Sequence, residues 1–184
     1  MKHLRLFLPI LLGILFVFSV AKSSTDTTKR ISVYISFSEV CPLCKEMLPS
    51  IEEIIQKFES KCFFYFVLTN KNVSKEKLYR LIEKFQKKPI LIFDSSKTVA
   101  KRFGFTVTPE VVVLNVENEV MYSGALDDRF VDFGQTKKHS IKPHLHDALQ
   151  SIIKGKSPSI VSTKAFGCYI SYRPQYKPIF ESVK

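Results

Sequence analysis

Strand-like and helix-like segments alternate along most of this chain, and this alternation restricts its fold more than any other feature. Residues 30–37 (RISVYISF) alternate in polarity and are rich in β-branched side chains, as in a strand. Residues 62–69 (CFFYFVLT) form a continuous apolar run of strand length, as expected for a strand covered on both faces. Between the two, apolar residues recur at helical spacing as far as Phe58. The pattern predicts a strand, a helix and a second strand.

The alternation continues toward the C terminus, and it predicts six further elements. These are a helix over 74–88 with Ser74 as N-cap, a strand over 89–93, a short helix over 95–104 closed by Gly104, strands over 110–115 and 119–124 that form an antiparallel hairpin, and a helix over 142–155. The order predicts an α/β fold, with a central mixed β-sheet and helices on both faces. Residues 127–142 are polar and aperiodic, and we expect a surface loop there.

The ends of the chain differ from this middle part. Residues 1–21 have a basic start and an apolar run of 16 residues from Leu6 to Ala21, with small residues at its end, as in a secretory signal peptide. The run is shorter than the ~18 residues of a spanning helix, and an uncleaved anchor stays the alternative. We expect an exported protein, periplasmic or otherwise secreted or lumenal, with one domain over 22–156. A Pro-rich, aromatic C-terminal tail over 157–184 is expected to pack on that domain.

The formal net charge of +11 could indicate a nucleic acid or an acidic membrane as partner. The lysines are spread over predicted helix faces, however, and no arginine-rich block or aromatic RNA-binding motif accompanies them. We therefore interpret the charge as solvated surface. The expected partners include no nucleic acid, and a membrane only through an uncleaved signal segment.

All four cysteines, Cys41, Cys44, Cys62 and Cys168, follow the predicted signal peptide and would reach a compartment where disulfides persist. No second CxxC follows Cys44, and the histidines lack finger-like spacing, so we expect neither a metal site nor a cofactor. His144 and His146 are two apart on a predicted helix and do not share a face, which disfavours a copper site.

Cys41 stands where the first strand meets the first helix. A thiol there faces unpaired backbone N–H groups and the positive end of the helix dipole, which favours the reactive thiolate. Cys44 follows almost one turn later, within bonding distance. Pro42 falls on the first helical position, where its missing N–H costs nothing. These features suit a dithiol that opens and closes.

At these residues the chain resembles the thioredoxin superfamily, whose active-site helix reads C-x-x-C-K with a later proline. Here the motif is CPLCKEMLP, with Lys45 and Pro49. The segment TVTPEVVVLN resembles the family's cis-proline segment and implies a cis bond between Thr108 and Pro109, beside the cysteines. Gly124 matches the glycine that ends the family's last strand. The resemblance implies a thioredoxin-like fold and catalytic roles for Cys41 and Cys44, supported by Pro42, Thr108 and Pro109.

From Phe93 to Ile170 the chain also resembles redoxins of the alkyl hydroperoxide reductase/thiol-specific antioxidant group, which are related to peroxiredoxins. The shared features are an aspartate, a short helix, TPE, DDR, DAL, GK and a terminal GC. That terminal cysteine makes Cys168 a candidate resolving or relay thiol. Peroxiredoxins proper carry proline and threonine where this chain has Tyr34 and Ser38, so only a hydroxyl remains to hold a peroxide oxygen.

Three functions follow from these resemblances. The first is a thiol–disulfide oxidoreductase acting on protein disulfides or dithiols with a thiol electron donor, in which Cys41 attacks and Cys44 resolves. The second is a peroxiredoxin-like thiol peroxidase, or antioxidant protein. The third is a non-catalytic thioredoxin-fold binding module. Ile35 replaces the buried aspartate of thioredoxins, so no proton acceptor for Cys44 is obvious. Glu39 and Lys45 are the nearest candidates, and we interpret both as surface charges, with a role in catalysis as the alternative. We interpret Cys62 as an inert buried thiol.

Overall fold

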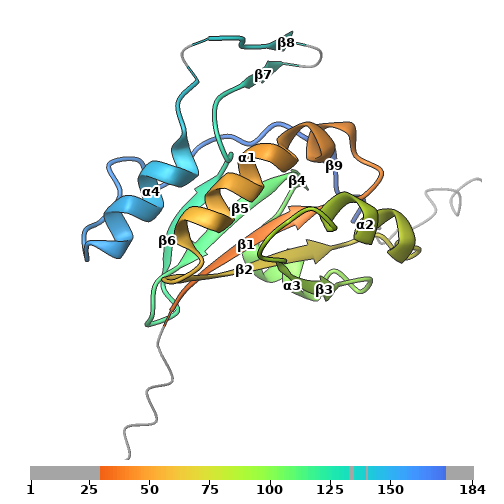
Figure 1. The fold of residues 1–184 in the computed structure, drawn as a ribbon, viewed down its shortest axis with the longest axis horizontal. Helices are drawn as coiled ribbons and strands as arrows, with labels where there is room; N and C mark the ends of the chain where they lie inside the picture. The colour runs from red at the N-terminus through yellow and green to blue at the C-terminus, as the bar shows by residue number, and fades with distance from the viewer. Residues whose placement is uncertain (1–29, 133–134, 140, 173–184) are drawn as a thin grey trace, which may run out of the picture.

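The computed structural model describes residues 30–132, 135–139 and 141–172, and the predicted signal peptide lies outside these ranges. A five-stranded sheet with the order β3-β2-β1-β5-β6 forms the centre (Figure 1). Its strands are β1 (Ile31–Phe37), β2 (Cys62–Leu68), β3 (Ile90–Phe93), β5 (Glu110–Leu114) and β6 (Val120–Gly124). Strands β1, β2 and β3 pair in parallel, whereas β5 pairs antiparallel with both β1 and β6. The predicted mixed sheet and hairpin are therefore confirmed.

Helices cover both faces of this sheet, as predicted. Cores on opposite faces follow from the alternation of side chains along each strand. In β5, Val111 and Val113 join one core cluster, whereas Val112 and Leu114 join the other. The first, larger cluster receives apolar side chains from α1 (Pro42–Phe58), α2 (Lys75–Ile82) and α4 (His144–Ile153), and the second receives them from α3 (Thr98–Phe103). Figure 1 shows α1 and α4 lying across the same side of the sheet.

Several local predictions are confirmed at the level of single groups. The Ser74 hydroxyl caps α2 by accepting a hydrogen bond from the Lys77 N–H at 3.4 Å. Gly104 closes α3 with φ of 68°, a backbone conformation that a side chain disfavours. Within the described residues, no helix has both the length and the apolar character required to cross a bilayer.

Several elements differ from the sequence prediction. Helices α3 and α4 are each shorter than the predicted ranges 95–104 and 142–155, and two other differences are larger. Helix α2 ends at Ile82 instead of continuing to Lys88, because the chain turns and buries Phe85 in the larger core cluster. Part of the expected surface loop is a small antiparallel pair, β7 (Phe130–Asp132) and β8 (Gln135–Thr136). Most of its residues are exposed, so no apolar alternation marks it in the sequence.

The described part of the C-terminal segment runs along the domain and contacts it at two places. Near its start, the Thr163 N–H donates to the Ser123 carbonyl at 3.0 Å, and the Thr163 hydroxyl accepts from the Ala125 N–H at 2.9 Å. Gly124 has φ of 131°, and a Cβ there would overlap Thr163. Further on, β9 (Cys168–Tyr169) pairs with β4 (Val107–Thr108), which lies beside the start of α1 in Figure 1.

Candidate active site around Cys41

Cys41 occupies the N-cap position of α1, with extended backbone angles of −73° and 122°, and Pro42 is the first helical residue. The sequence prediction for both is confirmed. The Cys41 N–H donates to the Ser38 carbonyl at 3.2 Å, which fixes the turn between β1 and α1. The Cys41 side chain is only 2% exposed and lies at the positive end of a 17-residue helix. The helix dipole stabilises negative charge at this position.

The bond between Thr108 and Pro109 is cis, as predicted. The Thr108 carbonyl oxygen lies 3.3 Å from Cys41 Sγ, so this loop forms one wall of the site. Two side chains that sequence reasoning missed hold the loop in place. The Ser36 hydroxyl donates to the Val107 carbonyl at 2.7 Å and accepts from the Glu110 N–H at 2.8 Å. The Glu110 carboxylate in turn accepts hydrogen bonds from backbone N–H groups of the same loop.

Cys168 is disulfide-bonded to Cys41, with 6.2 Å between the two Cα atoms. Strand β9 places Cys168 directly opposite Thr108, so backbone pairing brings the two thiols together across 127 residues of sequence. The sequence predicts a Cys41–Cys44 pair, with Cys168 as a candidate resolving or relay thiol. The structure brings all three cysteines to one place and joins Cys41 to the distant one.

Cys44 is a free thiol, fully buried one turn along α1 from Cys41. Burial raises its pKa to about 12. Hydrogen bonds with the Ser38 backbone and the Thr108 side chain lower this pKa, and the charge of Glu39 raises it further. At neutral pH this group is therefore a thiol that must lose its proton before it can attack.

Glu39 is the acidic side chain beside this thiol. It is only 2% exposed, and its Oε1 accepts a hydrogen bond from the Ser74 N–H at the start of α2, at 3.1 Å. Its Oε2 is buried and has no hydrogen-bond partner among the described residues. The surface-charge interpretation of Glu39 is therefore wrong, whereas Lys45, the other candidate acceptor, is exposed. Glu39 lies in the turn between β1 and α1, and nothing in the sequence around it indicates that its side chain is buried.

Cys62 is distant from this site. It is a buried free thiol whose register partner in β1 is Ile31, at the end of the sheet opposite Cys41. Burial raises the pKa of Cys62 to about 12, which fits the interpretation of an inert thiol. Among the described residues, no group of three His, Cys, Asp or Glu side chains is arranged to hold a metal ion.

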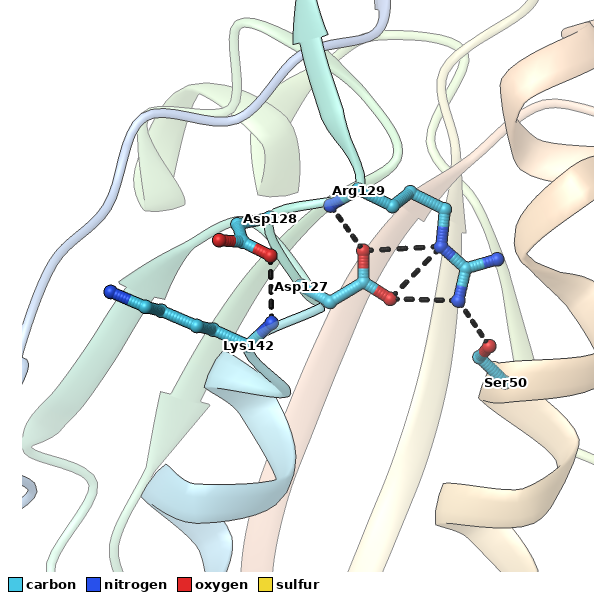
Figure 2. Close-up of polar contacts among 5 residues, drawn as sticks. All are labelled: Ser50, Asp127, Asp128, Arg129 and Lys142. Atoms are coloured by element: carbon cyan, nitrogen blue, oxygen red, sulfur yellow. Dashed lines mark hydrogen bonds and ion pairs between the residues drawn. The ribbon is translucent and has the colours of Figure 1, made fainter. Parts of the chain in front are cut away.

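The side chains that could donate to a bound peroxide are Ser38 and two arginines, and both arginines are engaged elsewhere. Ser38 is buried, and its hydroxyl accepts a hydrogen bond from the Asn70 side chain at 2.9 Å. Arg102 lies over the ring of Phe103 on α3. The third candidate, Arg129, belongs to the DDR motif. It forms a bidentate ion pair with Asp127, as close as 2.9 Å, and also donates to Ser50 of α1 at 2.6 Å (Figure 2).

This motif ties the loop after β6 to the active-site helix. Asp127 accepts from both the backbone and the guanidinium of Arg129, while Asp128 accepts from the Lys142 N–H just before α4 (Figure 2). Lys137 pairs with the same Asp128 at 2.7 Å. The DDR residues therefore position α1 and α4 relative to β6.

Replacement of Arg129 by alanine should lower the free energy of unfolding by about 1–3 kcal/mol, because it leaves the mostly buried Asp127 carboxylate without its partner. Lys137→Ala is the matched control, since its ion pair with Asp128 is more exposed and should contribute less than about 1 kcal/mol. Urea unfolding of both variants measures the difference. Equal losses would show that Arg129 is a surface charge.

The fold and this cysteine cluster define a thioredoxin-like thiol redox protein. A model of the family described as Redoxin matches residues 19–136, well over half of the chain, so the chain belongs to the Redoxin family. The predicted resemblance to redoxins is confirmed. No curated protein matches the chain in a sequence search.

Two solved structures share this fold. A hypothetical protein from Sinorhizobium meliloti 1021 aligns with a TM-score of 0.68 at 17% identity, over 78% of this chain and 80% of that one. An uncharacterized conserved protein from Geobacillus kaustophilus gives the same TM-score at 18% identity, over 79% of each chain. At these identities the likeness establishes the thioredoxin-like fold alone.

Proposed function

We propose that this chain is an exported thiol–disulfide oxidoreductase in which Cys41 is the nucleophile and Cys44 the resolving thiol. The observation that carries the proposal is a disulfide on Cys41 with a third, unpaired thiol one helical turn away. Such an arrangement is what disulfide exchange requires, because the exchange passes through a disulfide that a neighbouring thiolate can attack. Export rests on the signal-peptide pattern of residues 1–21.

In this mechanism the Cys41 thiolate attacks one sulfur of a protein disulfide, and the other sulfur leaves as a thiolate. A Cys41–substrate disulfide remains. Cys44, once deprotonated, attacks Cys41 Sγ and forms the Cys41–Cys44 bond, while the second substrate sulfur leaves and takes up a proton. The substrate is reduced by two electrons, and the Cys41–Cys44 pair is oxidised by two. An external thiol donor then restores the dithiol, and the reverse sequence oxidises a substrate.

Cys168 fits this mechanism as an internal counterpart of the substrate sulfur. It is bonded to Cys41 from β9, the strand that pairs with Thr108, whereas Cys44 lies on helix α1. Attack of the Cys44 thiolate on Cys41 would form Cys41–Cys44 and release the Cys168 thiolate, with no net oxidation or reduction.

Reduction of insulin disulfides by dithiothreitol is the direct test. The chain is expected to accelerate the reaction well above its uncatalysed rate, and Cys62→Ser should leave that acceleration intact because Cys62 lies at the far end of the sheet. A rate equal to that without protein, with Cys41 shown to be reduced, would contradict the proposal.

Peroxide reduction is the second candidate, because a Cys41–Cys168 bond is also the product expected when Cys168 condenses with a sulfenic acid on Cys41. Fast reduction needs donors that stabilise charge on the leaving oxygen; here Arg129 is paired with Asp127 and Ser50, which leaves the buried Ser38 hydroxyl as the candidate donor. We expect hydrogen peroxide to oxidise Cys41 only as fast as an ordinary activated thiolate. A stopped-flow rate orders of magnitude higher, lost in Ser38→Ala, would favour the peroxidase.

The resolving step should depend steeply on pH. Burial raises the pKa of Cys44 to about 12, so its thiolate fraction is small at neutral pH and grows as pH rises toward that value. We expect the release of a substrate from its disulfide with Cys41 to accelerate about tenfold per pH unit between about pH 7 and pH 10. Rapid-quench measurement in a Cys168→Ser background isolates this step. A plateau near pH 8 would contradict the raised pKa.

Glu39 gives a second handle on the same step. Its charge raises the pKa of Cys44, so Glu39→Gln should lower that pKa. The pH profile of substrate release should then shift to lower pH, and release should be faster at any pH below the pKa of Cys44. Glu46→Gln is the matched control, because Glu46 is an exposed glutamate on α1. Slower release in Glu39→Gln alone would instead identify the carboxylate as the group that takes the Cys44 proton.

A further inference from the structure

The segment from Phe166 to Ile170 lies against β4 as an added strand. Cys168 pairs with Thr108 and Tyr169 with Val107, and the Ile170 N–H donates to the Thr106 carbonyl at 2.9 Å. These contacts use backbone groups of a two-residue strand that is not part of the central sheet. Backbone pairing of this kind does not depend on the sequence of the added strand, so any extended peptide that met the side-chain demands of the site could form it.

The residues on either side of Cys168 show which side-chain contacts the site requires. Ile170 is 7% exposed and packs in the smaller core cluster, with Ala100, Phe105 and Val112 among its members. On the other side, Phe166 lines a small cleft together with Met47, Pro109, Leu126 and Phe130. The intervening Tyr169, by contrast, is 85% exposed. The segment therefore inserts alternate groups into the domain around the reactive sulfur.

The tightest of these contacts is at Gly167. A Cβ built on Gly167 would overlap the carbonyl group of Thr108, at 2.7 Å from its carbon, and would lie 3.1 Å from the Thr108 nitrogen. These are backbone atoms of the loop beside Cys41, and they cannot move aside as a flexible side chain could. Any residue larger than glycine immediately before the cysteine would have to move the whole segment away from β4.

We propose that the chain's own segment Phe166–Ile170 is a tethered competitor for extended peptides that pair with the edge of β4, and that this edge selects peptides with a glycine immediately before the reactive cysteine. The proposal rests on the proposed function, because it specifies which protein disulfides reach Cys41. A substrate must displace the segment before its sulfur can occupy the position now held by Cys168. In that exchange an external thiol donor first reduces the Cys41–Cys168 bond. The Cys41 thiolate then attacks the peptide disulfide, one peptide remains bonded to Cys41, and the other leaves as a thiolate.

The test makes the same substitution, glycine to alanine, first in a free peptide and then in the chain's own segment. The chain carries Cys44→Ser and Cys168→Ser, so that Cys41 disulfides are trapped and the segment is not covalently bound. It is mixed with the symmetrical disulfide of the peptide AFGCYI, which copies residues 165–170, or of AFACYI. Mass spectrometry follows the Cys41–peptide adduct. We expect AFACYI to react about tenfold more slowly or worse, as overpacking against fixed atoms predicts.

In the chain itself the same substitution should act in the opposite direction. Gly167→Ala weakens the tethered competitor, so AFGCYI should form the adduct several-fold faster, and iodoacetamide should alkylate Cys41 faster by a similar factor. Tyr169→Ala is the matched control, because that side chain is exposed, and it should change neither rate. Far-UV circular dichroism checks that each variant is folded, and the peptide comparison requires no change in the fold.

Equal reaction of the two peptides would overturn the glycine selection. Unchanged adduct formation and alkylation in a folded Gly167→Ala chain would overturn the tethered competitor. Both readouts measure binding at β4 and access to Cys41, and neither requires turnover. A failure of the chain to reduce insulin would therefore count against the proposed function and leave the binding result intact.

Discussion

Replacement of Cys41 by serine should abolish disulfide reduction, with a loss on the order of 10³-fold or more, down to the uncatalysed rate. Cys41 is the one described cysteine that both occupies a helix N-cap position and contacts the cis-proline loop, and it is bonded to Cys168. In the proposed mechanism Cys44 also acts through it. A serine hydroxyl at the same place is not ionised near neutral pH and cannot form a disulfide. Insulin reduction with dithiothreitol measures the loss.

Cys62→Ser is the control for Cys41→Ser, because both remove a buried cysteine but only one lies at the helix start. Equal free energies of unfolding for the two variants would show that any difference in rate comes from chemistry. Residual turnover above a few per cent in Cys41→Ser would assign the nucleophile to another thiol.

Cys44→Ser should reduce turnover by about 100-fold and should trap disulfides between Cys41 and partner proteins. In the proposed mechanism the thiol that releases the substrate is tethered one turn away, and its loss replaces an intramolecular attack by a slow attack from a free donor. Cys168→Ser should keep its turnover, because Cys168 holds the position of a substrate sulfur and is not needed for release.

Non-reducing electrophoresis of extracts that contain each variant makes the comparison. Adducts with Cys44→Ser that are absent with Cys41→Ser would agree with the assigned roles. If Cys44→Ser kept full turnover and Cys168→Ser lost it, Cys168 would be the resolving thiol and the CxxC mechanism would be wrong.

Local signals in the sequence were sufficient for the fold. Alternating and continuous apolar runs identified the five strands of the sheet, and single capping residues such as Ser74 and Gly104 marked helix ends correctly. The small pair β7 and β8 escaped prediction because its side chains are mostly exposed and bury no apolar face. Helix α2 was predicted too long because its helical pattern continues into Phe85, whose burial follows a turn of the chain.

The candidate site was predictable in part. The position of Cys41 and the cis bond before Pro109 followed from a motif and a family resemblance, and both are present. The bond from Cys41 to Cys168 could not be derived, because it depends on pairing between segments 60 residues apart, at Thr108 and Cys168. The burial of Glu39 likewise depends on the start of α2, far along the chain. Contacts of this range leave no periodicity in a single sequence.

We propose that every disulfide this protein forms includes Cys41. Peptide mapping by mass spectrometry, after oxidation by one equivalent of a disulfide and rapid acid quenching, identifies which cysteines are bonded. We predict bonds between Cys41 and Cys168 and between Cys41 and Cys44, in proportions that change with pH, and no bond that lacks Cys41. A predominant bond between Cys62 and either Cys44 or Cys168, with Cys41 left as a thiol, would contradict the account.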